Sequence, residues 1–317
     1  MRRRARDEVG VSPSRSIVIV AGIDAGGTSW KLIAAKGPGG ILARATIPTT
    51  TPEENVAAAA DWIDKMRGEG CSIEALGLAS FGPVDRNRKS QTYGLIGATP
   101  KPGWRGANPL RMLEQETGLP CTLDTDVNAA LLAEAAWGAG KGLSDVVYIT
   151  VGAGVGGAAL VARNLVGAPG HAEFGHIKPA RAEYDRQTFA GSCPYHGDCI
   201  EGLASATAIA ARWGADPHLL PDTHEAWPLV ADSLAQLCVS ITYLLAPQRI
   251  ILGGGVMKRA ILMDMIRAQF VERTNGYTVR AEADHADTYI FTPGLGGDAG
   301  ALGAAYLALE ANGASAR

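Results

Sequence analysis

The chain has 317 residues, of which 47% are hydrophobic and 19% are charged, so it has enough apolar side chains for two packed domains. The formal net charge of −3, with no basic block beyond the first few residues, gives no indication of a nucleic-acid partner. No apolar stretch approaches 18 continuous residues, so no membrane span is expected. Five cysteines without a secretory signal favour a reducing, cytoplasmic location.

The first half is predicted to begin, after a disordered extension over residues 1–15, with a strand, a glycine turn and a second strand over 17–35. A third strand follows at 41–50. A helix is then expected with Thr51 as N-cap and Pro52 at its first position, since these residue types favour a helix start. A strand in 73–85 that ends in a Gly-Pro loop, a helical segment over 108–120 and a strand leading into a helix near Val127 complete this half.

The second half repeats the opening pattern. Residues 145–162 again predict a strand, a glycine turn and a strand, and residues 225–256 predict a long apolar helix followed by a buried strand. The chain ends on a short strand, a glycine-rich turn and a helix over 288–310. Two halves that open with the same unit indicate an internally duplicated α/β fold, with a ligand cleft between them.

The glycine turn in "GIDAGGTSWK" places Asp24 and Thr28 around Gly26 and Gly27. Backbone N–H groups in such a turn can contact phosphate oxygens, because glycine adds no side chain. A carboxylate before the turn can hold the hydrated magnesium that accompanies a nucleotide. A β-hairpin that merely needs glycine at its turn explains the same letters.

The corresponding turn in the second half, "TVGAGVGGAAL", contains G-x-G-x-x-G at Gly152, Gly154 and Gly157. A dinucleotide site would need these glycines to open a helix, whereas the residues that follow are typical of a returning strand. A second phosphate-binding hairpin is therefore favoured. The sequence contains no P-loop motif.

Two acids, Asp124 and Asp126, stand at the predicted strand-to-helix junction in "LDTDVNAALLAE". Phosphoryl transfer to an alcohol needs a carboxylate within reach of the hydroxyl proton, and an aspartate at this place could supply it. Helix capping is the competing interpretation.

The segment "CPYHGDC" holds Cys193, His196 and Cys199 at three-residue steps, with His176 upstream. Two thiolates and two imidazoles form a closed tetrahedral set that suits structural zinc, although a Cys193–Cys199 disulfide remains an alternative. The other three cysteines lie in apolar runs and are expected to be core thiols. Glu173 and Glu201 flank this loop and could accept hydrogen bonds from sugar hydroxyls, or could simply be solvated acids.

In this order, the segments resemble the ROK family of sugar kinases, within the actin-like ATPase superfamily. The first and second glycine turns resemble the family's phosphate loops, "GHAEFGH" its sugar-binding motif, and "CPYHGDCIEG" its zinc loop. "ILGGGV" and "GLGGDAGALGAA" resemble its adenosine-side turns. The segments "YGLIGATPKPGWRG" and "SCPYHGDCIEGLAS" are most similar to bacterial zinc-dependent fructokinases, and Thr125-Asp126 departs from the Asn-Asp of glucose-directed relatives.

The resemblance implies a two-domain actin-like ATPase (ribonuclease H-like) fold. A smaller α/β domain is expected over 16–125 plus 299–317, and a larger one with the zinc loop over 126–298. By position, Asp126 would be the catalytic base. The sugar-side residues would be Thr125, Glu173, His176 and Glu201, with His176 also a zinc ligand beside Cys193, His196 and Cys199. The ATP and phosphate residues would be Asp24, Gly26, Gly27, Thr28, Lys31, Thr150, Gly152, Gly154, Gly254, Gly255 and Gly297.

The expected activity is ATP-dependent phosphorylation of a hexose at its C6 hydroxyl, with fructose as the first choice, Mg²⁺ accompanying ATP and structural Zn²⁺. Alternatives are a glucokinase or mannokinase with broad hexose tolerance, or a non-catalytic sugar sensor. The family's repressors carry a helix-turn-helix ahead of the kinase-like body, and the residues before the first strand are too few for one. The resemblance favours a cytoplasmic homodimer.

Overall fold

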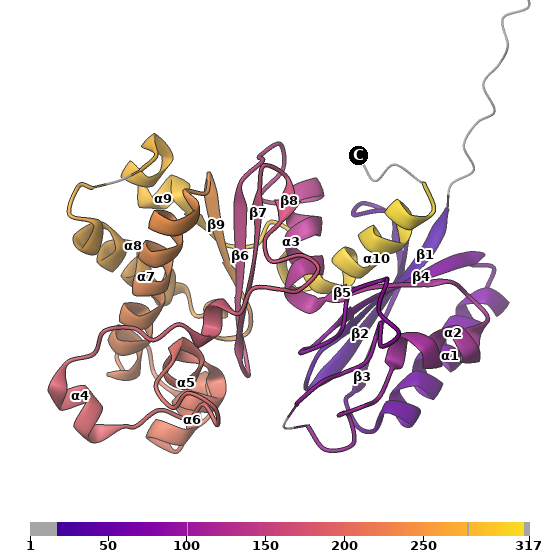
Figure 1. Ribbon diagram of the computed structural model, residues 1–317, viewed down its shortest axis with the longest axis horizontal. Coiled ribbons are helices and arrows are strands. Elements are labelled where there is room, and N and C mark those ends of the chain that lie inside the picture. Colours follow the sequence, from indigo (N-terminus) through magenta and orange to yellow (C-terminus); the bar gives the residue numbers. More distant parts are fainter. Residues whose placement is uncertain (1–17, 100, 278, 314–317) are drawn as a thin grey trace, which may run out of the picture.

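The computed structural model describes residues 18–99, 101–277 and 279–313, which form two five-stranded sheets with helices around them (Figure 1). The predicted extension over residues 1–15 lies outside the described part of the chain. The strands of the first sheet are β1 Ile19–Ala25, β2 Ser29–Ala35, β3 Ile41–Pro48, β4 Ile73–Ser80 and β5 Cys121–Thr125. The strands of the second are β6 Val146–Val151, β7 Val155–Val161, β8 Asn164–Leu165, β9 Arg249–Gly253 and β10 Ile290–Phe291.

The two sheets have the same topology. The first has the order β3-β2-β1-β4-β5, in which β1 pairs antiparallel with β2 and parallel with β4. The second, written from its other edge, has the order β8-β7-β6-β9-β10, with β6 antiparallel to β7 and parallel to β9. The internal duplication predicted from the repeated strand–turn–strand pattern is thus present in the hydrogen-bonding of both sheets.

The helices are α1 Pro52–Gly68, α2 Pro109–Thr117, α3 Asp126–Trp137, α4 Glu183–Thr188, α5 Ile200–Ala204, α6 Ala206–Trp213, α7 Ala226–Leu245, α8 Ala260–Thr274, α9 Ala286–Tyr289 and α10 Ala299–Ala311. The predicted helices are present as α1, α2, α3, α7 and α10, and α4, α5, α6, α8 and α9 were not predicted from the sequence. The predicted N-terminus of α1 is correct: the Thr51 hydroxyl accepts a hydrogen bond from the Glu54 N–H, and Pro52 is the first helical residue. These contacts satisfy backbone donors that the helix itself cannot.

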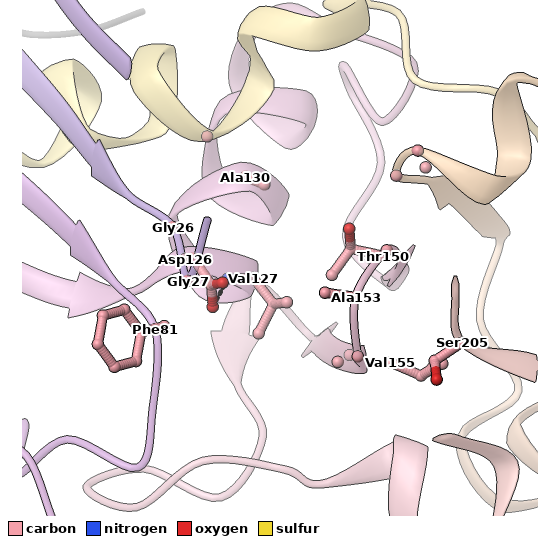
Figure 2. Close-up of a pocket in the computed structure, with 18 of the residues that line it drawn as sticks. Gly26, Gly27, Phe81, Asp126, Val127, Ala130, Thr150, Ala153, Val155 and Ser205 are labelled. Carbon is pink, nitrogen blue, oxygen red and sulfur yellow. Dashed lines mark hydrogen bonds between the residues drawn. The ribbon is translucent and has the colours of Figure 1, made fainter. Parts of the chain in front are cut away.

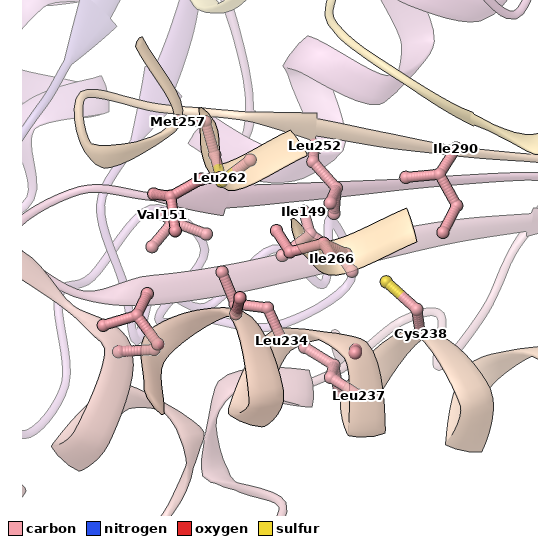
Figure 3. Packing of buried hydrophobic residues seen from close by; sticks show 14 of the residues in the cluster. Ile149, Val151, Leu234, Leu237, Cys238, Leu252, Met257, Leu262, Ile266 and Ile290 are labelled. Carbon is pink, nitrogen blue, oxygen red and sulfur yellow. The ribbon is translucent and has the colours of Figure 1, made fainter. Parts of the chain in front are cut away.

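The large second core is built around α7 (Figure 3). Leu234, Leu237 and Cys238 on this helix face Ile149 of β6, with α8 packed alongside. By length and mean hydropathy, α7 could span a membrane. This was not indicated by the sequence, where only a continuous apolar run was considered. Half of α7 is buried inside the protein, as in the central helix of a packed domain.

Helices α3 and α10 lie between the two sheets (Figure 1). Helix α10 contacts α3, β1 and β4, and its Ala301, Leu302 and Ala305 form a cluster with Val20 of β1. The C-terminal helix therefore packs on the first sheet. The exact domain boundaries stay a prediction.

The approach of α10 to the first sheet depends on Gly77 of β4. A Cβ atom at this position would lie 1.7 Å from the carbonyl oxygen of Ala304, far inside van der Waals contact. Because both atoms belong to backbone in regular elements, neither can move without displacing the helix from the sheet.

Gly77→Ala is expected to lower the free energy of unfolding by about 1–3 kcal/mol or more, because overpacking forces this helix and sheet apart. Denaturant unfolding followed by circular dichroism measures the change. Gly68→Ala is the matched control, since Gly68 in the last turn of α1 has no atom near its missing Cβ. Equal unfolding midpoints for the two variants would contradict this account of the packing.

Candidate active site

A cleft of about 1210 Å³ runs between the two sheets, larger than a site for a single small ligand. Both glycine turns open onto it (Figure 2), with Asp126 beside Gly26 and Gly27 on one side and Thr150 and Ala153 across the gap. Every residue assigned to sugar, ATP or phosphate from the sequence lines this one cleft: Asp24, Gly26, Gly27, Thr28, Lys31, Thr125, Asp126, Thr150, Gly152, Gly154, Glu173, His176, Glu201, Gly254, Gly255 and Gly297.

The first glycine turn connects β1 to β2. The Gly26 N–H donates to the Ser29 carbonyl over 3.1 Å, and the Thr49 hydroxyl donates to the Gly26 carbonyl over 2.7 Å. Lys31, on β2, reaches across to donate to the Gly297 carbonyl over 2.9 Å. The turn is thus fixed from both sides, and its lysine bridges to the turn that precedes α10.

The second glycine turn connects β6 to β7 as an antiparallel hairpin, so the dinucleotide interpretation of G-x-G-x-x-G does not hold here. The Gly152 N–H donates to the Gly154 carbonyl over 2.8 Å. The Val155 N–H donates to a carboxylate oxygen of Glu201 over 3.0 Å. One oxygen of Glu201 therefore positions this turn. From the sequence, Glu201 was predicted to contact the sugar instead.

The turn after β9 also faces the cleft. Gly254 has a φ of +97°, and the backbone of Val151 would lie 2.3–2.6 Å from a Cβ atom there. Only glycine fits this left-handed, crowded position. The turn is thereby held against the end of β6, where the predicted adenosine-side glycines meet the second glycine turn.

Asp126 is the first residue of α3, directly after β5. Thr125 caps this helix by accepting from the Asn128 N–H over 3.2 Å, so capping does not require Asp126. One Asp126 oxygen accepts from the Val127 N–H over 2.9 Å, and the side chain lines the cleft. The sequence left a choice between capping and chemistry, and the geometry leaves this carboxylate available for chemistry.

Asp24 and Asp126 share the same enclosed part of the cleft. Loss of water, followed by the negative charges of Asp24 and Glu173, raises the pKa of Asp126 to about 7. Burial raises the pKa of Asp24 to about 6, against the lowering effect of Lys31. Two carboxylates that line one cleft and raise each other's cost of ionisation form a favourable environment for a divalent cation, which offsets their repulsion.

Asp124 has a structural task that the sequence did not reveal. Its carboxylate forms an ion pair of 2.6 Å with Arg86, and both side chains are more than 90% buried. The other oxygen accepts from the Asn128 side-chain amide over 2.7 Å. Arg86 also donates to the Gly170 carbonyl over 2.5 Å, so it connects the strand that leads to Asp126 with the loop before Glu173.

His171 is a second residue that sequence reasoning missed. Its Nε2 lies 2.8 Å from Oε1 of Glu173, and this hydrogen bond raises the pKa of the imidazole. The other Glu173 oxygen lies 4.0 Å from Nε2 of His176. His171 lines the cleft, and its position two residues before Glu173 was the signal that could have identified it.

The four predicted metal ligands come together. The ligand atoms of His176, Cys193, His196 and Cys199 all lie within 4.8 Å of one another. The sulfur of Cys193 is 3.9 Å from Nδ1 of His176 and 3.7 Å from Nδ1 of His196, and the sulfur of Cys199 is 3.6 Å from Nδ1 of His176. Tetrahedral zinc with ordinary bond lengths places sulfur and nitrogen ligands about 3.5 Å apart, so the set fits this ion.

The cysteines are free thiols rather than a disulfide in the structure. Cys193 and Cys199 are buried at the cluster, whereas His196 is exposed and lies outside the cleft lining. Of the expected core thiols, Cys238 is buried, and Cys71 and Cys121 are partly buried against the first core.

Comparison with known proteins agrees with this geometry. The model of the ROK family matches residues 20–311. A fructokinase from Zymomonas mobilis is 41% identical over 91% of this chain and 96% of its own, and one from Pediococcus pentosaceus is 36% identical over 93% and 99%. The crystal structure of a ROK family glucokinase from Streptomyces griseus, in complex with glucose and AMPPNP, is 27% identical, with a TM-score of 0.74 over 92% of this chain and 99% of that one. The chain is a member of the ROK family, a sugar kinase with the actin-like ATPase fold.

Proposed function

We propose that the protein transfers the γ-phosphoryl group of ATP to the C6 hydroxyl of a hexose, with fructose as its main substrate. The observation that carries this proposal is the position of Asp126, in one cleft with both phosphate turns and with the loop that holds His171 and Glu173. The fructokinase from Zymomonas mobilis is 41% identical to this chain and the Streptomyces glucokinase 27%, which favours fructose over glucose.

In the reaction, Asp126 accepts the proton of the sugar hydroxyl as its oxygen attacks the γ-phosphorus. A base with a pKa near 7 is suited to this transfer at neutral pH, since it is ionised in part and still basic enough. The turns at Gly26–Gly27 and Gly152–Gly154 line the cleft, and their N–H groups other than those of Gly26 and Gly152, which donate within the turns, would contact phosphate oxygens. Asp24 would hold the Mg²⁺ that comes with ATP, and this ion neutralises charge on the phosphate oxygens.

On the sugar side, Glu173 and His171, which is hydrogen-bonded to it, offer hydrogen-bonding groups for sugar hydroxyls. Thr125 and Glu201 line the same space, and Glu201 keeps one oxygen free of the Val155 contact. Closure of the two domains over the sugar would exclude water and align the hydroxyl with ATP.

The four-ligand cluster would hold a structural Zn²⁺. All four coordination positions are filled by protein, so the ion would not activate water. It would fix the loop that leads into α5, where Glu201 contacts the second phosphate turn. Glu173, 4.0 Å from the other ring nitrogen of His176, lies where an outer carboxylate orients a metal-bound imidazole. The homodimer and the cytoplasmic location stay predictions from the family resemblance.

The substrate assignment is tested with an assay that couples ADP release to absorbance across fructose, glucose, mannose and N-acetylated hexosamines. We expect kcat/KM for fructose to exceed that for every other sugar by about tenfold or more, since mismatched hydroxyls leave polar groups of the site unpaired. Identification of the product by NMR would show phosphate at C6. A higher kcat/KM for glucose or mannose would replace fructokinase with a broader hexose kinase.

Asp126→Asn is expected to lower kcat by about 10²–10⁴-fold while fructose binding changes little, because the amide cannot accept the hydroxyl proton. Steady-state kinetics and calorimetric titration with fructose measure the two effects. Asp64→Asn, at an exposed acid on α1, is the matched control. Turnover of the Asp126 variant near that of the control would remove Asp126 from the chemistry.

Cys193→Ser is expected to lose zinc and thermal stability together, because three remaining ligands bind the ion less tightly and the loop loses its anchor. Zinc per chain, measured by mass spectrometry, should fall well below one, and the melting temperature should fall by several degrees. Cys71→Ser, remote from the cluster, should keep both values. Full zinc content in the Cys193 variant would show that the ligand set is wrong.

A further inference from the structure

In addition to Lys31, which belongs to β2, a second lysine contacts the first phosphate turn. Lys101 lies in the segment between β4 and α2, and its ammonium group donates to the carbonyl of Gly27. Its Cε atom lies 3.9 Å from the position that a Cβ at Gly27 would take. The side chain lines the same cleft as Asp24 and Asp126. It lies in the segment "YGLIGATPKPGWRG", which is similar to fructokinases, but it was assigned no role from the sequence.

The backbone next to Lys101 is anchored in the core. Trp104 is fully buried, and its ring packs 5.9 Å from Trp30 and 5.1 Å from Phe81 between ring centroids. Its indole N–H donates to the Thr50 carbonyl over 2.8 Å, and its backbone N–H donates to the Lys101 carbonyl over 3.3 Å. The lysine therefore extends into the cleft from a segment that Trp104 holds on its C-terminal side, which helps to position its side chain.

The surroundings of Lys101 would allow its ammonium group to exchange the Gly27 carbonyl for a phosphate oxygen. Within the described part of the chain, the side-chain contact found for Lys101 is to a neutral carbonyl and not to a carboxylate. A phosphate oxygen beside the Gly27 turn would replace that carbonyl with a charge-assisted hydrogen bond, which is roughly twice as strong as a neutral one. Lys31, by contrast, is directed toward Gly297 at the start of the α10 turn. The two lysines thus reach the turn region from different elements.

We propose that Lys101 is a catalytic residue that contacts the phosphoryl group during its transfer, an inference that rests on the proposed kinase function. In this step a bond forms between the sugar oxygen and the γ-phosphorus, and the bond from that phosphorus to the β–γ bridging oxygen breaks. The hydroxyl proton passes to Asp126, and the electron pair of the broken bond leaves on ADP. Lys101 balances the negative charge on the oxygens of the moving group, and no proton is transferred to or from it.

Contact with the moving group predicts an effect on turnover rather than on substrate binding. Negative charge spreads over the three oxygens of the phosphoryl group as it leaves ADP, so a fixed cation there stabilises the transition state more than bound ATP. Loss of one such contact typically lowers kcat by about 10²–10³-fold. A lysine that only held the Gly27 turn would instead affect ATP binding and stability.

The test compares Lys101→Met and Lys101→Arg with wild type in the fructose kinase assay. We expect the Met variant to lose about 100-fold or more in kcat, with KM for fructose and MgATP changed by less than about threefold. The Arg variant should recover part of the loss, because the charge is kept and the geometry is altered. Lys65→Met, at an exposed lysine on α1, is the matched control, and thermal melting should show all variants folded.

A binding measurement separates catalysis from positioning. MgADP with aluminium fluoride and fructose imitates the transferring phosphoryl group, and its affinity should fall with kcat in the Met variant, whereas MgATP affinity should not. Unchanged kcat, or a raised fructose KM at unchanged kcat, would overturn the proposal, as would an equal loss of MgATP affinity. If wild type is active and Lys101→Met is equally active, this inference alone is rejected. If wild type phosphorylates no hexose, the kinase function is rejected together with it.

Discussion

Asp24 and Asp126 place two carboxylates in one enclosed cleft, and the electrostatic cost of that arrangement defines what the site can do. Each is partly buried, which raises its pKa, and the charge of Asp24 raises the pKa of Asp126 as well. Such a pair of carboxylates is stabilised when a cation binds between them, when one of them takes up a proton, or when both happen. A kinase that binds magnesium with ATP and removes a proton from an alcohol uses both.

The duplicated fold creates this arrangement. Asp24 lies at the end of β1, and Asp126 begins the helix that follows β5, two strands away in the same sheet. Helix α3 then runs between the sheets beside α10 (Figure 1), and Val127 at its start lies close to Gly156 of β7, next to the glycine turn of the second sheet. The position of the proposed base therefore depends on helix packing that Gly77 permits.

Two contacts link the proposed sugar-binding part of the cleft to other parts of the site. Arg86 connects Asp124 to the Gly170 carbonyl, and Glu201 connects the Cys/His loop to the second phosphate turn. Both contacts join groups that are far apart in sequence. In each, a charged side chain is hydrogen-bonded to the backbone of another segment. Metal binding at the Cys/His cluster would thus fix the geometry of the phosphate turn through Glu201, at a distance from the chemistry.

Much of this could be predicted from the sequence, because short-range signals determine it. The strand–turn–strand repeats, the Thr51–Pro52 helix start and the close spacing of Cys193, His196 and Cys199 are local patterns with local causes. Arg86, His171 and Lys101 were missed, because their importance comes from contacts that cross the fold. Lys101 meets Gly27 only after Trp104 has packed against Trp30, and no local pattern encodes that meeting. For Glu201 the pattern indicated a site residue but not its bond to Val155.

The most direct measurement is a crystal structure of the protein with fructose, MgADP and aluminium fluoride. The account predicts that a carboxylate oxygen of Asp126 lies within hydrogen-bonding distance, about 2.6–3.2 Å, of the C6 hydroxyl, in line with the fluoride group. An Asp126 side chain turned away from that hydroxyl, with another group in its place, would contradict it.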